Sequence, residues 1–459
     1  MRSAILVRVP FWIVLFGLVA WLGSVPVLGT EAPAAWKAGT ASVVVTPDEL
    51  MWMAGYAARD KPAEGKIHDL HAKALVLEDG GGTRLAIVTL DLISVPREVR
   101  DWLEEQVGRR HDLPPEALMI NASHTHCGPE LRPDKVYLPE DHAARSRRYV
   151  ETLQNKLLKL VGQALCDLTP VSLSYTHARA GFAMNRRTPA KNGPRNHPYP
   201  DGPVDHDVPV LQVTADEDDL KAVLFGYACH ATTLSSYQFC GDYPGFAQQY
   251  LEESRPGTMA LFMAGCGGDQ NPYPRRELDL CRQHGRALSN GVETALQTET
   301  KPVGGPLRMA LDEVELEFAE PPSREQLEKE AQSNNKWERR HAELLLDELE
   351  RAGRIRTSYS VPVQVVRFGS DLILVALPGE VVVDYSLRLK RELAGPAVWV
   401  AGYCNDVFGY LPSLRVLEEG GYEGGGAMRY TPFPGPFAPS VEKLIVDKVH
   451  ELAKKTESD

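Results

Sequence analysis

Two histidines two positions apart are the feature of this sequence with the clearest capacity for chemistry. His124 and His126 lie in the segment Asn-Ala-Ser-His-Thr-His-Cys-Gly-Pro at residues 121–129, directly after an apolar run at 117–120. Side chains at positions i and i+2 share a face only where the backbone is extended, so a strand end would direct both imidazoles to one point. One could bind a metal ion while the other moves a proton. A pair of hydrogen-bonded loop histidines gives the same pattern, and both interpretations stay open at this point.

Three further segments carry candidate groups at expected element ends. His230 follows an apolar run at 222–227, a position where ligands gather in α/β folds and where buried core histidines also occur. Glu380 follows a Leu-Pro-Gly turn, where an acid equally suits the start of a helix. Residues 264–272 form a glycine-rich turn that allows close backbone approach to a ligand. The absence of a lysine at the required spacing argues against a phosphate loop.

Other chemical interpretations are weaker. His68 and His71 flank Asp69, and His206 lies between two aspartates, but these groups favour structural roles. The chain has seven cysteines without a Cys-x-x-Cys pair, which argues against a cysteine-rich zinc site. It also lacks a Gly-x-Ser-x-Gly segment, which argues against a serine hydrolase of that type.

The elements that would position these residues alternate between strand and helix, which predicts an α/β fold. We expect mixed β-sheets layered with helices in a single large catalytic domain over residues 36–456. Expected strands lie at 39–46, 72–77, 85–90, 117–120, 171–176, 209–213, 222–227, 259–264, 361–368, 372–377 and 398–403, and expected helices at 97–109, 143–165, 246–253 and 441–452. A hairpin is expected where the strands at 361–368 and 372–377 meet.

Two segments interrupt this alternation. Residues 187–207 are rich in Pro, Asn, Gly and Asp and are predicted to form a long ordered loop. Residues 323–352 are strongly charged with a narrow apolar stripe, which predicts a helical excursion that packs through one face.

Composition limits location and partners. The chain of 459 residues is 43% hydrophobic and carries a net charge of −12, so it can bury a large core and lacks the basic face that nucleic acid binding needs. Residues 1–29 combine arginines, an apolar centre and a small-residue exit, which predicts a signal peptide and an exported, periplasmic or secreted protein. An uncleaved anchor is the alternative, because the apolar character continues to Leu28. No later segment is long and apolar enough to be expected as a membrane span. The oligomeric state stays open.

Taken together, these segments resemble the neutral ceramidase family, the neutral/alkaline non-lysosomal ceramidases. The resemblance spans most of the chain after residue 38. It rests on residues 39–43, 53–56, Ile67-His68, 75–78, the His-Thr-His-Cys-Gly-Pro segment, Asn185-Arg186, Gly241-Asp242 with Gly245, Gly268-Asp269, Pro378-Gly379-Glu380, Tyr410 and Tyr422. Members of that family carry a C-terminal immunoglobulin-like domain for which this chain has no room, so the resemblance implies the catalytic domain alone.

The resemblance implies a catalytic Zn²⁺ held by two histidines, a glutamate and a tyrosine. By motif these metal ligands fall on His124, His230, Glu380 and Tyr410. The implied reaction is hydrolysis of the N-acyl amide of ceramide, or of a related small-molecule lipid or amide, by a metal-activated water. The implied catalytic residues are His126 as proton shuttle or orienter, with Arg186 and Tyr422 in contact with the scissile amide.

One position departs from the family pattern. Asn271 stands where the family usually carries a serine, and an amide cannot act as an alkoxide nucleophile, although it could donate a hydrogen bond to an oxyanion. This replacement leaves two alternatives open. The chain could hydrolyse another amide or an ester, or it could be a non-catalytic homologue that binds zinc or lipid.

Overall fold

The computed structural model describes residues 36–132, 138, 141–215, 219–393 and 395–457. The predicted signal peptide at 1–29 lies outside these residues. The described residues belong to a single unit, and the elements within it alternate as an α/β fold, so the predicted fold class is confirmed.

A mixed sheet organises the first two thirds of the chain. Its central strands are almost continuously apolar, as expected for strands buried on both faces. Within the described residues the sheet has nine strands in the order β12-β10-β9-β6-β1-β3-β4-β5, with β14 paired to β6. Their bounds are β1 Trp36–Val44, β3 His71–Glu78, β4 Arg84–Leu90, β5 Leu118–Ala122, β6 Thr169–Arg179, β9 Asp207–Thr214, β10 Leu220–Tyr227, β12 Met259–Ala264 and β14 Lys301–Pro302.

A second sheet follows, in the order β15-β16-β17-β19. Its strands are β15 Leu307–Glu317, β16 Ser358–Phe368, β17 Leu372–Ala376 and β19 Ala397–Ala401. β16 and β17 pair antiparallel, as the sequence predicts, whereas β17 and β19 run parallel.

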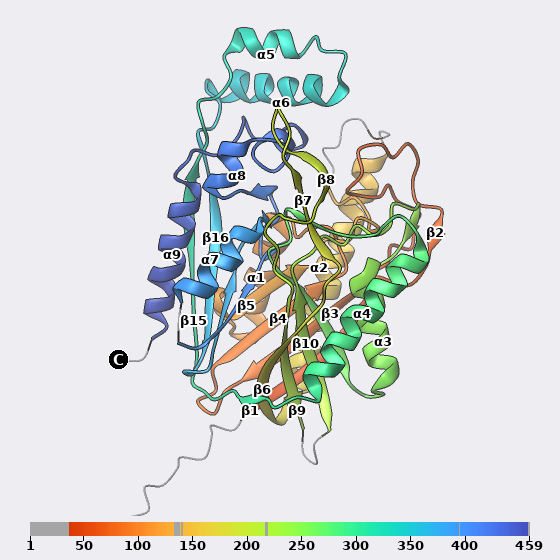
Figure 1. Ribbon diagram of the computed structural model, residues 1–459, viewed down its shortest axis with the longest axis vertical. Helices are drawn as coiled ribbons and strands as arrows, with labels where there is room; N and C mark the ends of the chain where they lie inside the picture. The colour runs from red at the N-terminus through yellow and green to blue at the C-terminus, as the bar shows by residue number, and fades with distance from the viewer. Residues whose placement is uncertain (1–35, 133–137, 139–140, 216–218, 394, 458–459) are drawn as a thin grey trace, which may run out of the picture. The chain divides into compact units, whose positions relative to one another are not determined.

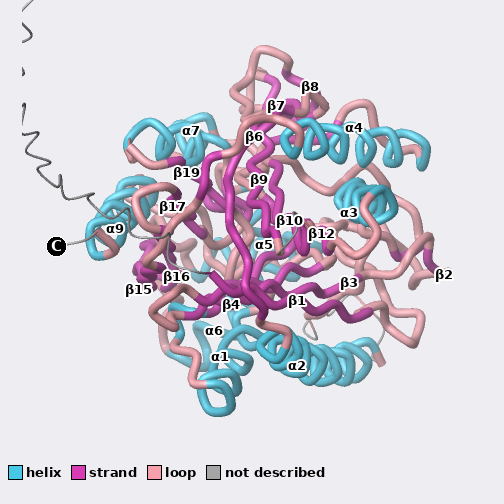
Figure 2. The backbone as a smooth tube through the Cα atoms, turned by 90° about the horizontal axis from the view of Figure 1, so that it is seen from below, coloured by secondary structure: helices cyan, strands magenta, loops and turns pink. Residues whose placement is uncertain are grey.

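The alternation of side chains along β3 shows how the layers stack. Ala74 and Val76 face the helices, and Leu75 and Leu77 face the second sheet, because successive side chains of a strand point to opposite faces. The first core therefore lies between the first sheet and α1 Arg97–His111, α2 His142–Cys166, α3 Asp242–Ser254 and α4 Leu278–Leu296. The second core lies between the sheets, and the third lies under α7 Val383–Glu392 and α9 Val441–Lys455 (Figure 2). The result is a helix–sheet–sheet–helix sandwich.

Short strands connect the layers. They are β2 Gly65–Lys66 with β11 Gln238–Phe239, β13 Gln270–Pro272 with β7 Ala183–Thr188 and β8 Arg195–Tyr199, and β18 Glu380–Val381 with β20 Tyr410–Leu411. The prediction of a continuous loop over 187–207 is wrong, because β8 pairs with β7 as a hairpin. The exposed β8 segment lacks the apolar alternation that marks a half-buried strand. The remaining short helices are η1 Pro115–Ala117, α8 Leu414–Glu419 and η3 Gly426–Tyr430.

The charged segment at 323–352 forms a helical hairpin at the top of Figure 1. Its helices are α5 Arg324–Glu330 and α6 Lys336–Ala352. Ser323 and Asn335 cap their N-termini through side-chain oxygens, and α6 ends at Gly353 with a φ of 72°. The hairpin buries a small core of its own, made of Leu327, Ala342, Leu345 and Ile355. None of the helices in the described part of the chain has the length and apolar composition needed to cross a bilayer.

Candidate active site

The candidate residues lie where the edges of the two sheets meet. His124 follows β5 and His230 follows β10, and both strands belong to the first sheet. Glu380 and Tyr410 begin β18 and β20, and these two residues are direct partners in the parallel pairing of those strands. A bridge between Asn121 and Cys404 joins the two halves next to the site. Residues separated by up to 286 positions in the chain are thereby brought into one cluster.

The polar atoms of this cluster converge on one point. Glu380 Oε2 lies 3.3 Å from His124 Nε2 and 3.1 Å from His230 Nε2. The Tyr410 hydroxyl lies 3.3 Å from His230 Nε2. Ligands 2.0–2.1 Å from a tetrahedral zinc ion lie about 3.3 Å from one another, so these separations fit such an ion. The structure thus brings together all four residues predicted as metal ligands.

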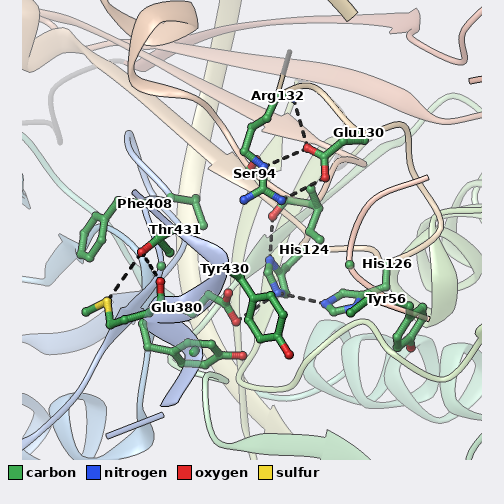
Figure 3. A pocket seen from close by; sticks show the side chains of 18 of the residues that line it. Tyr56, Ser94, His124, His126, Glu130, Arg132, Glu380, Phe408, Tyr430 and Thr431 are labelled. Carbon is green, nitrogen blue, oxygen red and sulfur yellow. Dashed lines mark hydrogen bonds and ion pairs between the residues drawn. The ribbon is translucent and has the colours of Figure 1, made fainter. Parts of the chain in front are cut away.

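His126 belongs to the same cluster. Its Nε2 lies 3.2 Å from His124 Nε2 (Figure 3). The nitrogens of His124, His126 and His230 form a group compatible with metal binding. The His126 ring packs against Tyr56 with 4.9 Å between centroids, and its buried Nδ1 has no hydrogen-bond partner. The predicted proton shuttle therefore lies directly beside His124, one of the predicted ligands.

Backbone carbonyls fix the orientation of two imidazoles. His124 Nδ1 lies 2.6 Å from the Ile93 carbonyl oxygen, and His230 Nδ1 lies 2.6 Å from that of Gly267. A donated Nδ1–H leaves the Nε2 lone pair directed into the cluster. Gly267 lies in the predicted glycine-rich turn, and a Cβ there would come within 2.6 Å of the Cys229 backbone nitrogen. The glycine thus lets this turn approach closely enough to hold His230.

The electrostatics favour a cation. Burial lowers the pKa of His230 to about 4, and burial together with the neighbouring imidazoles lowers the pKa of His126 well below its usual value. Burial alone would raise the pKa of Glu380, but His124 and His230 hold it well below its usual range. The cluster therefore combines a carboxylate held in its ionised form with a neutral His230 imidazole, and carboxylate oxygens and imidazole nitrogens are donors that suit Zn²⁺.

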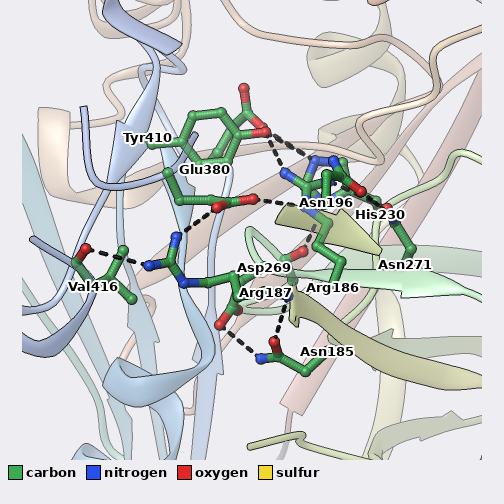
Figure 4. Close-up of polar contacts among 12 residues, drawn as sticks. Asn185, Arg186, Arg187, Asn196, His230, Asp269, Asn271, Glu380, Tyr410 and Val416 are labelled. Atoms are coloured by element: carbon green, nitrogen blue, oxygen red, sulfur yellow. Dashed lines mark hydrogen bonds and ion pairs between the residues drawn. The ribbon is translucent and has the colours of Figure 1, made fainter. Parts of the chain in front are cut away.

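A buried arginine supports the cluster from behind. Arg186 Nη2 donates to the Tyr410 hydroxyl at 2.8 Å, and Arg186 Nε donates to Glu423 at 2.8 Å (Figure 4). The neighbouring Arg187 donates to the other oxygen of Glu423 at 2.6 Å. Burial would lower the pKa of Arg186, but Tyr410 and Glu423 raise it well above the usual value. Arg186 therefore stays charged and fixes the hydroxyl of a predicted ligand.

The remaining predicted residues take different positions. Tyr422 is 38% exposed, lines the cavity and lies 5.4 Å from the Tyr410 ring. Asn271 is fully buried, and its side-chain oxygen accepts hydrogen bonds from Arg186 Nη1 and Thr232, each at 3.2 Å. Arg186 and Asn271 are not among the described residues that line the cavity. Asn271 therefore contacts Arg186, which in turn donates to the Tyr410 hydroxyl, and it has this indirect connection to the metal cluster.

The other polar groups noted in the sequence are engaged elsewhere. His68 lies 3.2 Å from the Cys240 sulfur, and His206 contacts the Ala183 carbonyl oxygen. All seven cysteines are free thiols, and six of them are buried. Glu423 was not singled out in the sequence, although it directly follows Tyr422 in the Tyr-Glu-Gly motif.

His124, His126, Glu380 and Tyr410 line a cavity of about 260 Å³, whereas His230 is not among its described lining residues. The lining is largely apolar and also carries an ion pair between Glu130 and Arg132 with contacts of 2.9 and 3.0 Å. Part of the apolar lining comes from α6 and from residues 407–430, namely Trp337, Val407, Phe408, Ala427, Met428 and Tyr430. A substrate with both an apolar and a polar part fits such a cavity.

Comparisons with known proteins identify similar chains. A family model described as neutral/alkaline non-lysosomal ceramidase, N-terminal, matches residues 38–305. Neutral ceramidase 1 of Arabidopsis thaliana is 24% identical over 260 residues, which cover 54% of this chain and 33%, about a third, of that relative. A crystal structure of neutral ceramidase from Pseudomonas aeruginosa superposes with a TM-score of 0.71 at 19% identity and covers 93% of this chain and 76% of its own. A structure titled ceramidase complexed with C2 has a TM-score of 0.71 at 18% identity, with 93% and 77% coverage.

Proposed function

Because the chain belongs to the neutral/alkaline non-lysosomal ceramidase family, we propose that it is a zinc-dependent hydrolase of the N-acyl amide bond in ceramide or a related lipid. The observation that carries this proposal is the convergence of His124, His230, Glu380 and Tyr410 with separations of 3.1–3.3 Å. We further propose, from the predicted signal peptide, that the protein is exported.

The donor set fits the proposed metal in number, chemistry and charge. His124 and His230 offer Nε2 atoms, Glu380 offers a carboxylate oxygen and Tyr410 offers a hydroxyl. When bound there, Zn²⁺ supplies a Lewis acid that polarises a carbonyl and makes a coordinated water more acidic.

His126 is the proposed general base and acid. Its lowered pKa keeps it neutral, so Nε2 can accept a proton from the attacking water and later donate it to the leaving nitrogen. The products are a carboxylic acid and an amine, and the proton taken from water leaves with the amine.

Tyr422 and Arg186 have different proposed roles: Tyr422 acts on the substrate carbonyl, and Arg186 acts through Tyr410. Tyr422 lines the cavity beside Tyr410, where its hydroxyl can donate to the oxygen that becomes negative. Arg186 lies behind Tyr410 and fixes the hydroxyl of that residue through Nη2. Arg186 is therefore a positioning residue in this structure.

The test of the proposed function combines metal content with turnover. Purified protein is expected to contain about one zinc per chain and to hydrolyse a fluorescent N-acylsphingosine, and a chelator should abolish turnover until zinc is restored. His124→Ala should lose both zinc and turnover. Full activity in metal-free protein would contradict the proposal. Retained zinc without turnover of any N-acyl amide or ester would favour the non-catalytic alternative that Asn271 leaves open.

Replacing Asn271 tests the support of Arg186. Asn271→Leu should lower kcat/KM about tenfold, because a buried charged donor that loses its acceptor costs about 1–3 kcal/mol. Asn271→Asp keeps the acceptor for Arg186 Nη1 and is expected to stay within about threefold of the wild type. The measurement is steady-state hydrolysis of the same N-acyl substrate. Equal rates for Asn271→Leu and the wild type would show that this hydrogen bond does not support the site.

A further inference from the structure

The helical hairpin at 323–352 reaches the active-site cavity through one side chain. Trp337, in the first turn of α6, lines the same cavity as His124 and Glu380. Its ring lies 5.1 Å from that of Tyr430 at an interplanar angle of 70°, an edge-to-face contact. The charged hairpin thus contributes a large apolar group to a wall otherwise built by residues 407–431.

Contacts on both sides of Trp337 fix its position. The Asn335 side chain caps α6 by accepting from the Trp337 backbone nitrogen at 3.0 Å. One turn further along α6, His341 Nε2 lies 2.6 Å from the Phe433 carbonyl oxygen, which ties the helix to the segment that follows η3. The small core of the hairpin holds the rest of α6. The indole is therefore held against Tyr430 by an ordered support.

Different parts of the cavity lining differ in what they can bind. Tyr430, Met428 and Phe408 line the cavity together with Trp337, and the lining also holds the paired Glu130 and Arg132. Figure 3 shows Phe408 and Tyr430 apart from Glu130 and Arg132. An alkyl chain placed against that ion pair would remove water from charged groups without replacing their hydrogen bonds. An alkyl chain placed against Trp337, Tyr430, Met428 and Phe408 removes from water both its own apolar surface and that of these side chains.

We propose that Trp337 determines the acyl-chain preference of the enzyme by binding the distal part of the acyl chain against the wall formed with Tyr430, Met428 and Phe408. This inference rests on the proposed amide hydrolysis. It assigns the direction of the acyl chain, with the amide at the metal cluster and the acyl chain under α6.

Chain-length kinetics test this proposal. Trp337→Ala should lower kcat/KM about tenfold for a palmitoyl amide, chiefly through KM, because several methylene groups lose their apolar partner. The same variant should stay within about twofold of the wild type for a butyryl amide, because its short chain has few methylene groups to bury against Trp337. Trp337→Phe should restore most of the preference. Trp102→Ala, which removes a half-buried indole on α1 outside the described cavity lining, serves as the matched control.

A binding experiment separates this proposal from the proposed reaction. Calorimetry with palmitate and butyrate, the acids that amide hydrolysis would release, measures chain binding without turnover. A tenfold weaker palmitate affinity in Trp337→Ala with unchanged butyrate affinity supports the assigned wall, even if no amide is hydrolysed. Equal losses for the long and short chains, or none for either, would overturn it.

Discussion

Glu380→Gln is expected to reduce amide hydrolysis by about 10³-fold or more and to leave the purified protein without zinc. The carboxylate contacts both His124 and His230, and its low pKa keeps it ionised between the two imidazoles. Glutamine has nearly the same shape but removes this charge and turns an acceptor into a donor aimed at Nε2 atoms. A loss of several kcal/mol of transition-state stabilisation corresponds to this rate effect.

Elemental analysis and steady-state kinetics measure the two effects together. Glu392→Gln, a substitution of a surface carboxylate at the end of α7, is the matched control and should keep both zinc and turnover. The unfolding temperature of Glu380→Gln should stay close to that of metal-free wild type, which separates loss of the site from loss of the fold. A variant that retains zinc and normal turnover would rule out Glu380 as a ligand.

Glu423→Gln is expected to destabilise the protein by about 3–5 kcal/mol, the largest effect on folding that we predict. Glu423 is 3% exposed and binds two buried arginines, with contacts of 2.8 Å to Arg186 and 2.6 Å to Arg187. A neutral amide would leave the positive charge of both guanidinium groups partly uncompensated in the interior. The free energy of unfolding from urea denaturation at neutral pH provides the measurement.

Glu419→Gln is the matched control for this substitution. Glu419 also contacts Arg187 but is 38% exposed, so its loss should cost about 1 kcal/mol or less. Burial would raise the pKa of Glu423, but Arg186 and Arg187 lower it below the usual 4.5. Its contribution is therefore present above pH 4.5 and is lost as the pH falls through the lowered value. The difference between wild type and Glu423→Gln should shrink in that acidic range, and a difference independent of pH would contradict the ion-pair explanation.

Much of the fold could be predicted because its central strands are short, apolar and separated by turn-forming residues. The runs at 72–77, 85–90 and 222–227 fall within strands β3, β4 and β10. The stacking of two sheets could not be predicted, because a strand buried on both faces shows the same apolar run whatever covers each face. Strand β8 was missed because its exposed residues lack any apolar pattern.

Site residues could be predicted where they belong to a sequence motif. They could not be predicted where only the folded structure brings them next to the site. His124 and His126 were recognisable from their spacing, whereas grouping Glu380 and Tyr410 with them required the family resemblance. Glu423 contacts Arg186 across 237 positions, so no local pattern marks it. Trp337 belongs to the apolar stripe of the 323–352 segment, but the stripe does not indicate that this side chain lines the cavity. The apolar stripe predicted one packed face of the 323–352 segment but not which surface that face would meet.

The proposed metal ligands come from two distant parts of the chain, and this limits when a metal ion can bind during protein synthesis. Two of the proposed ligands follow strands of the first sheet, whereas the other two belong to the β18–β20 pair beside the second. A nascent chain that has emerged only as far as residue 300 already contains both histidines, yet it lacks the carboxylate and the phenol. High-affinity metal loading should therefore await emergence of the chain beyond residue 411, which makes it a late step of maturation.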